Sequence, residues 1–243
     1  MAVPTKSKDK KIIGQRTTWT WPHYPETIYW LQLQRDDELK NDKAFRRFRR
    51  YRGINATIVI LSASVVEGFL IECLESFADR FQAEDTMVKR LSHDYLRRLE
   101  RANQYDRQLL FKIATGKTID EHLGGEDVPI VKAISNLFKL RNCVAHARPI
   151  SYVSHGEKHQ DFDEYLYEME GQFAVVEKYL IHTKKLLHAS DGYSVNDLLE
   201  NKCVDFFAEQ VKPYIDEVLK HLNNSNKFGV QHSVNVAFRQ FLK

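Results

Sequence analysis

Apolar residues recur along most of this chain with the spacing of an α-helix. Between residues 54 and 81 they recur every three or four positions and also occupy the other faces. A helix that is apolar nearly all round is a central one. Apolar stripes of the same period cover 92–115, 129–147 and 163–188. We therefore predict an all-α protein whose core is an up-and-down bundle of four helices.

Further helices are expected on both sides of this bundle. One runs from about Glu26 to Tyr51 and is closed by Gly53, and another starts near Ser194 and contains Pro213. A short final helix covers about 230–242. The predicted organisation is a basic arm with an N-terminal helix (1–53), a helical bundle (54–190) and a C-terminal helical extension (191–243).

The helix over 92–115 is expected to turn its leucines inward and its arginines outward. Leu109, Leu110 and Ile113 belong to the predicted inner face, and Arg107 belongs to the outer one. Gly116 is expected to end the helix.

The strongest candidate for chemistry is the end of the predicted helix over 129–147. Its apolar stripe continues to Arg141, so an arginine lies at the edge of the buried face. Asn142 and His146 are four residues apart and project from one side of the helix, within reach of the long Arg141 side chain. Pro149 then stops the helix. A cation, an amide and an imidazole are thus gathered at one helix end.

This run, Arg141-Asn142 followed by His146, resembles the R-x4-6-H motif of the HEPN superfamily, in which a polar residue often follows the arginine. The resemblance covers the predicted bundle and implies a HEPN-like fold. It implies a metal-independent endoribonuclease that needs no cofactor and acts by 2′-hydroxyl transesterification. It also suggests a prokaryotic toxin or antiviral defence effector, with RNA as the substrate.

The residue chemistry is compatible with that activity. A histidine with a pKa of about 6.5 both accepts and donates protons near neutrality, and an arginine forks two donors onto a phosphate. By position, Arg141 would be the electrostatic clamp, His146 the acid–base group and Asn142 an orienting amide. Glu67, in the middle of the apolar 54–81 helix, needs a partner. It either makes a structural ion pair or supports Arg141.

The densest positive stretch is Arg46, Arg47, Arg49, Arg50 and Arg52, five arginines in seven residues. Either these side chains hold RNA phosphates, or they form a solvated helix face with cations near a helix C-terminus. Residues 1–18 are read as a basic arm. The aromatic residues that follow it either stack on bases or pin the segment to the core; they are Trp19, Trp21, Tyr24, Tyr29 and Trp30.

Composition narrows the setting. The 36 basic and 33 acidic residues nearly balance, so the overall charge does not require a nucleic-acid partner. Three widely spaced cysteines favour reduced thiols and, with no apolar leader visible, a cytoplasmic location. Glu67 and Glu72 interrupt the best membrane-span candidate, so no membrane partner is expected. His155 and His159, with Asp161 and Asp163, are weak grounds for a metal site, and none is predicted.

Two partners follow from the ribonuclease hypothesis. A homodimer would supply a second imidazole to a shared site across a two-fold axis, and HEPN nucleases resemble this arrangement. An antitoxin or regulatory partner is also implied. The alternatives are a non-catalytic HEPN-like RNA-binding or partner-docking module, and a helical interaction protein in which Arg141 and His146 only satisfy a helix end.

Overall fold

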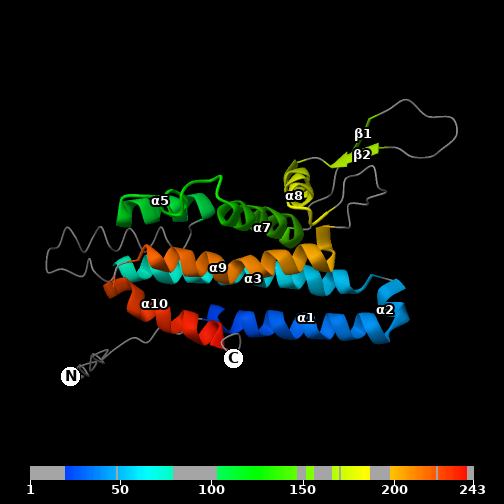
Figure 1. Cartoon of the computed structure of the whole chain (residues 1–243), viewed down its shortest axis with the longest axis horizontal. Helices are drawn as coiled ribbons and strands as arrows, with labels where there is room; N and C mark the ends of the chain where they lie inside the picture. Colours follow the sequence, from blue (N-terminus) through cyan, green and yellow to red (C-terminus); the bar gives the residue numbers. More distant parts are fainter. Residues whose placement is uncertain are drawn as a thin grey trace, which may run out of the picture.

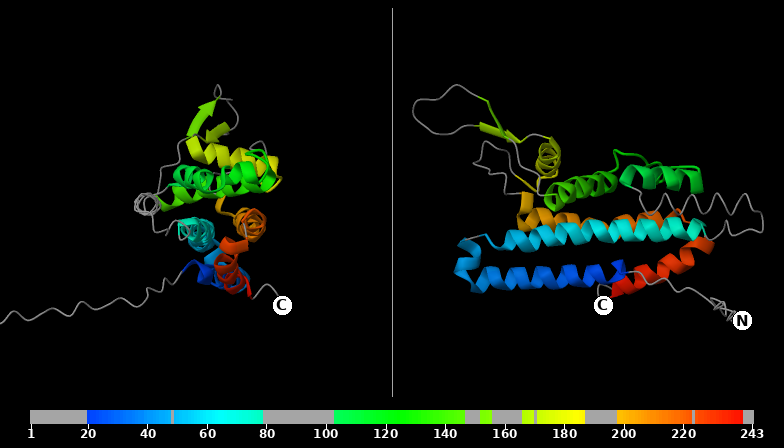
Figure 2. Two further views of the ribbon diagram at one scale, coloured as in Figure 1. Left: turned by 90° about the vertical axis from the view of Figure 1, so that its left-hand side faces the viewer. Right: turned by 180° about the vertical axis from the view of Figure 1, so that it is seen from behind.

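The structure, a computed structural model, describes residues 20–47, 49–78, 103–146, 152–155, 166–169, 171–186, 198–222 and 224–239. Within these ranges the chain is almost entirely helical, and one two-stranded hairpin is the only sheet (Figure 1). The all-α class is therefore confirmed. The helices lie in three layers, with α1 and α10 below, α3 and α9 in the middle, and α5, α7 and α8 above (Figure 2).

Helix α3 (Tyr51–Ala78) is the central helix, as predicted. It packs against α1 (Tyr24–Asn41), α7 (Pro129–Ala145), α9 (Asn201–Lys220) and α10 (Asn224–Ala237). Tyr51–Phe77 is long and apolar enough to cross a membrane by length and composition, and half of its most apolar window is buried inside the fold. Helix α3 is therefore packed as a core helix of this fold.

The helix predicted from about Glu26 to Tyr51 is confirmed as far as Asn41 and is wrong beyond it. Helix α1 ends at Asn41, and Asp42 adopts an extended conformation. The Asp42 carboxylate accepts a hydrogen bond from the backbone N–H of Ala44 and so caps the short helix α2 (Lys43–Arg47). Gly53 lies in the first turn of α3 and closes no helix. The predicted segment boundary at 53/54 therefore falls inside α3.

Helix α5 spans Gln104–Thr115 and begins with a capping box formed by Asn103 and Asp106. The single helix predicted over 92–115 therefore has a helix start inside it, and 92–102 lies outside the described residues. The predicted inner face is correct for Leu110, which is 4% exposed, and wrong for Leu109 and Ile113, which are 44% and 61% exposed. Arg107, predicted to face outward, is 8% exposed. Gly116, with a φ of 86°, ends the helix as expected.

A short helix α6 (Ile119–His122) leads to α7. Pro129 occupies the first turn of α7, where its missing N–H costs nothing, and His146 is the C-cap residue. The helix predicted over 129–147 is thus confirmed to within two residues.

The helix predicted over 163–188 is wrong in its first part. Strands β1 (Tyr152–His155) and β2 (Leu166–Met169) pair antiparallel, with Tyr152 opposite Met169. Gly171, with a φ of 68°, starts helix α8 (Gly171–His182). The left-handed backbone at this glycine separates the strand from the helix.

The C-terminal helices contribute to the central core. The predicted start at Ser194 lies outside the described residues; α9 starts at Asn201 and continues through Pro213. Helix α10 begins at Asn224, earlier than the predicted 230. One apolar cluster extends from Trp21 to Phe238. The three-part division of the chain stays a prediction, since packing alone does not test independent folding.

The N-terminal aromatic residues differ in burial, and Trp21 is shown to pack against the core. Trp21, in the 3-10 helix η1 (Trp21–His23), is 2% exposed and lies against Gly68 of α3. A Cβ on Gly68 would lie 2.5 Å from the Trp21 Cβ, so only glycine fits there. Tyr29 and Trp30, in contrast, are 39% and 60% exposed. Trp19 lies outside the described residues.

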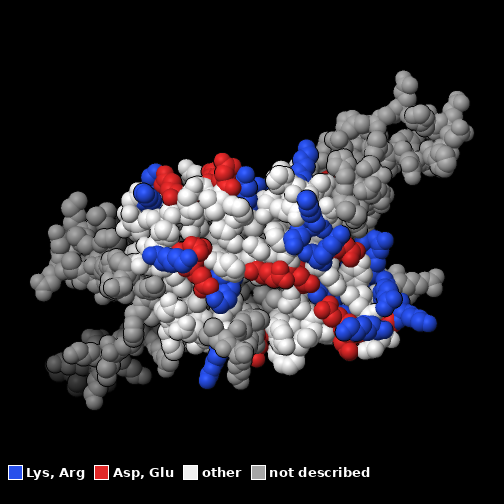
Figure 3. Space-filling view, viewed as in Figure 1, with Lys and Arg blue, Asp and Glu red and all other residues white. Residues whose placement is uncertain are grey.

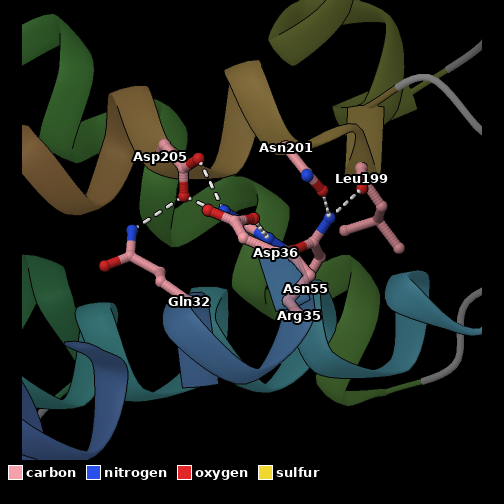
Figure 4. Close-up of polar contacts among 7 residues, drawn as sticks. All are labelled: Gln32, Arg35, Asp36, Asn55, Leu199, Asn201 and Asp205. Atoms are coloured by element: carbon pink, nitrogen blue, oxygen red, sulfur yellow. Dashed lines mark hydrogen bonds and ion pairs between the residues drawn. The ribbon is translucent and has the colours of Figure 1, made fainter. Parts of the chain in front are cut away.

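Buried polar groups join the lower and middle layers around Arg35 (Figure 4). The Arg35 guanidinium donates to both carboxylate oxygens of Asp205 at 2.9 Å, and to Asn55 at 2.9 Å. Asn55 in turn donates to the carbonyl of Leu199 and to the Asn201 side chain, at 2.7 and 2.8 Å. These contacts fix α1, α3 and the start of α9 relative to one another.

Candidate functional site

Arg141 lies near the end of α7, where that helix crosses α3. Its Nη1 donates to Asn142 Oδ1 at 2.9 Å, and its Nη2 forms an ion pair with Glu67 of α3. The guanidinium carbon also lies 5.9 Å from the centre of the Phe138 ring. The side chain keeps 21% exposure. Arg141 is therefore oriented by the fold but still open to solvent.

Glu67 accepts a second arginine at the same oxygen. Arg107 of α5 donates from Nη1 to Glu67 Oε1 at 3.0 Å, and Arg141 pairs with that same oxygen. Two guanidinium groups share one carboxylate, so the cluster carries a net charge of +1. The structure thus places Glu67 beside Arg141, as one of the two alternatives predicted for Glu67 required. It also adds a second cation, Arg107, to the same carboxylate.

Arg107 was not expected in this site. It is 8% exposed, and its Nε is buried without a hydrogen-bond partner among the described residues. The sequence did contain a signal, because the apolar residues Leu110 and Phe111 follow Arg107 by three and four positions and so share its helix face. Both are buried in the structure.

His146 lies one turn beyond Asn142, at the end of α7. Its backbone N–H donates to the Asn142 carbonyl at 3.3 Å, and its side chain is exposed. In the described part of the chain, no hydrogen bond joins the imidazole to Arg141 or Asn142. The structure therefore brings Asn142 and Glu67 each into contact with Arg141 and leaves His146 one turn away, facing solvent.

A groove with a mixed polar and apolar lining follows α7 and ends at Asn142. Its near part, of about 330 Å³, is lined by Tyr105, Phe138, Lys139 and Asn142 among others. A second hollow of about 520 Å³ continues toward α8 and shares Asp120, Val131, Ser135 and Lys139 with the first. Burial raises the pKa of Asp120, an effect that a hydrogen bond from Gln108 opposes. Volumes of this size are typical of small-ligand sites.

The arginine-rich segment lies away from this site. Arg46, Arg49 and Arg50 are exposed, whereas the Arg47 side chain lies outside the described residues. Arg52 precedes Glu67 by fifteen residues of α3, a separation of about 22 Å at 1.5 Å per residue. The two positive regions are therefore distinct within one chain.

Among the described residues, no group of three or more His, Cys, Asp or Glu side chains is placed to hold a metal ion. His155 lies in β1, and His159, Asp161 and Asp163 lie outside the described residues. The three cysteines, Cys73, Cys143 and Cys203, are buried and none of them is in a disulfide, in agreement with the prediction of reduced thiols.

Comparison with known proteins assigns no family to this chain: no protein-family model, no curated protein and no solved structure matches it. A functional proposal therefore depends on the chain's own residues.

Proposed function

We propose that this protein is a metal-independent endoribonuclease of HEPN type that cleaves RNA by 2′-hydroxyl transesterification. The observation that supports this most directly is the Arg141 guanidinium, held near the end of α7 by Glu67 and Asn142 and still partly exposed, with the exposed His146 one turn away. An oriented cation beside an accessible imidazole is the minimum that such a reaction needs.

Arg141 has the hydrogen-bonding capacity for a phosphate. A guanidinium carries five N–H donors, and Asn142 and Glu67 each accept from one of its terminal nitrogens. The remaining donors are available for non-bridging phosphate oxygens. Because Arg107 adds a second positive charge to the shared carboxylate, the cluster attracts anions despite containing Glu67.

In the proposed reaction, His146 removes the proton of a ribose 2′-hydroxyl. The 2′-oxygen then forms a bond to the adjacent phosphorus, and the bond from phosphorus to the 5′-oxygen breaks. A second acid protonates that leaving oxygen, which yields a 2′,3′-cyclic phosphate and a 5′-hydroxyl end. Arg141 stabilises the charge on the phosphate throughout, and Asn142 orients Arg141.

The second acid is proposed to be His146 of another copy in a homodimer, because an isologous interface beside the end of α7 would bring the two imidazoles together. The proposed setting is the cytoplasm, where the protein would act as a toxin or antiviral effector with an antitoxin or regulatory partner. Arg46, Arg47, Arg49 and Arg50 are proposed to contact the RNA backbone.

The test is cleavage of RNA with unpaired regions in the presence of EDTA. Wild-type protein should cleave, and His146→Ala should lose at least about 100-fold in rate, the usual contribution of a general acid–base group. His23→Ala is the matched control, since His23 is also an exposed histidine at a helix end. Cleavage that stops on chelation and returns with magnesium would overturn the mechanism.

A non-catalytic RNA-binding or partner-docking module is the second candidate. It is favoured by the absence of a hydrogen bond between His146 and the Arg141–Asn142 pair in the described structure. RNA binding without cleavage by the wild-type dimer would decide for it.

A further inference from the structure

Two helices of this protein end in the same way, with a basic residue in an unusual backbone conformation. Arg49 follows α2 with a φ of 51°, and Lys184 follows α8 with a φ of 58°. In the described ranges these are the only residues other than glycine with a positive φ. At both ends the backbone makes the pair of hydrogen bonds that defines a Schellman motif.

The hydrogen bonds match position by position. After α2, the N–H of Arg49 donates to Arg46 and that of Arg50 donates to Phe45, both at 3.1 Å. After α8, the N–H of Lys184 donates to Ile181 at 2.9 Å, and that of Lys185 donates to Leu180 at 2.8 Å.

Glycine is the usual residue at such a position, because a Cβ is strained in the left-handed conformation. Helix α5 follows this rule, ending at Gly116 with a φ of 86°. Arg49 and Lys184 instead hold a cation where the backbone favours glycine or asparagine. A cation near a helix C-terminus also interacts favourably with the helix dipole, but a position one residue earlier would give that benefit without strain.

Both ends approach the start of α9. Tyr51 donates to Glu200 at 2.6 Å, and Asn55 donates to the Leu199 carbonyl at 2.7 Å. From the other side, the Cys203 thiol donates to the Lys185 carbonyl at 3.7 Å. Segments 49–52, 183–186 and 198–202 therefore meet at one end of the molecule.

We call these three segments the basic end. They contain six lysines and arginines and one acidic residue, Glu200, whose carboxylate accepts the Tyr51 hydroxyl. Figure 3 shows several Lys and Arg side chains, with acidic side chains between them, at the end of the molecule that carries α2. The Nε and Nη2 atoms of Arg52 are buried there without a hydrogen-bond partner among the described residues. The six cations are Arg49, Arg50, Arg52, Lys184, Lys185 and Lys202.

We propose that the basic end binds the phosphate backbone of RNA, with Lys184, Lys185 and Lys202 acting together with the arginines that follow α2. This rests on the proposed function only in taking RNA as the polyanion. The charges come from three segments, so they can follow a strand instead of gripping one phosphate. The site at Glu67 is about 22 Å away along α3, a distance that about six stacked nucleotides cover at 3.4 Å each.

A membrane surface fits this region less well. Peripheral membrane binding combines cations with apolar side chains that enter the bilayer. None of the large exposed apolar residues in the described structure belongs to the three segments of the basic end. The exposed residues of the three segments, Arg49, Arg50, Lys184 and Lys202, are all cations.

The decisive variant is Arg49→Asn combined with Lys184→Asn. Asparagine accepts the left-handed conformation, so the melting temperature should stay the same or rise while two cations disappear. The control is Lys112→Gln with Lys220→Gln, which also removes two charges. Both control lysines are exposed and pair with surface carboxylates, and Lys220 lies at the opposite end of α9.

Binding is measured by fluorescence anisotropy of a single-stranded 2′-O-methyl RNA, which cannot undergo 2′-hydroxyl attack, over a series of KCl concentrations. The asparagine pair should weaken binding at least about tenfold at low salt and lower the log–log salt slope by about 1.4, the value for two phosphate contacts on a single strand. The glutamine pair should change the RNA affinity and the salt slope by only a small fraction of these amounts.

Equal effects of the two pairs, or no effect of the asparagine pair, would overturn the proposal. Tight binding to phosphatidylserine vesicles with no binding to the RNA would overturn it in favour of a membrane. The outcome is separable from the proposed activity. Cleavage by wild type with unchanged binding by the asparagine pair refutes the basic end alone, whereas a changed salt slope without any cleavage refutes the nuclease alone.

Discussion

Arg35 and Arg141 each contact a carboxylate from another helix, but the ratio of carboxylates to cations differs between the two centres. Arg35 is 1% exposed and donates from Nε to Asp36 and from its terminal nitrogens to Asp205 and Asn55. Two carboxylates surround that one cation. At Arg141 the ratio is reversed, since Arg107 and Arg141 share Glu67.

This difference separates a structural arginine from one that is available to a ligand. Burial alone would lower the pKa of Arg35, but the hydrogen bonds and charges of Asp205 and Asp36 outweigh it and raise the pKa. Its donors are used within the fold, and its centre carries a net negative charge. The Arg141 centre carries a net positive charge, partial exposure and unused donors, which are the properties of an anion site.

The largest expected effect comes from Arg35→Met. It leaves Asp205 and the Asn55 carbonyl without their buried partner, so the free energy of unfolding should fall by about 3 kcal/mol. Arg141→Met removes a partly exposed pair and should cost about 1 kcal/mol or less. Urea unfolding at neutral pH measures both. Similar losses for the two variants would remove the distinction between the two arginines.

Glu67→Gln tests the Arg141 centre by removing the negative charge of its shared carboxylate. Without the carboxylate, Arg107 and Arg141 face each other across a partly buried contact, and stability should fall by about 1–2 kcal/mol, less at high salt. Affinity for the uncleavable RNA should rise, because the net charge of the cluster increases from +1 to +2.

Asp205→Asn is the control for that result. It also removes one negative charge, but from the Arg35 centre, so it should lower stability and leave RNA affinity unchanged. Equal gains in RNA affinity from both variants would mean that overall charge, and not the cluster at Glu67, attracts the RNA.

The sequence predicted the motif helix well because local signals define it. The apolar stripe of α7 sets its buried face, Pro129 sets its start, and its end falls at His146, shortly before Pro149, as predicted. The need of Glu67 for a partner also followed from its place on an apolar helix.

The remaining features depend on signals that are weak or distant. The face of α5 was misjudged because leucines occur on both sides of it, and only Leu110 of the neighbouring pair is buried. Strand β2 falls inside the helix predicted over 163–188, because its four residues are too few to separate the helical period from the strand period. The partner of Arg35 lies 170 residues away, and no spacing rule connects such positions.

Glu72 gives the smallest expected effect. It is a second carboxylate on α3, but its hydrogen-bond donors are neutral, whereas those of Glu67 are cations. It is 8% exposed and accepts hydrogen bonds from Trp21 Nε1 at 2.9 Å and Ser233 Oγ at 2.6 Å, both neutral donors. Burial raises its pKa above the usual value of 4.5, although the hydrogen bonds from Ser233 and Trp21 oppose the shift. The folded state therefore binds this proton more tightly than the unfolded state does. Its contribution to stability is present below pH 4.5 and is lost as the pH rises through the folded-state pKa.

Glu72→Gln should therefore stabilise the protein at neutral pH, by less than about 1 kcal/mol, since the glutamine oxygen can accept from Trp21 while its amide donates to Ser233. The gain should shrink as the pH falls toward 4, where Glu72 is protonated in both states. Glu67→Gln, five residues earlier on the same helix, should have the opposite sign at neutral pH because it removes the partner of two cations. Urea denaturation of both variants at pH 4, 5.5 and 7 measures whether each substitution raises or lowers the free energy of unfolding. A loss of stability from Glu72→Gln at pH 7 would show that the charged form of Glu72 is the one that the fold favours.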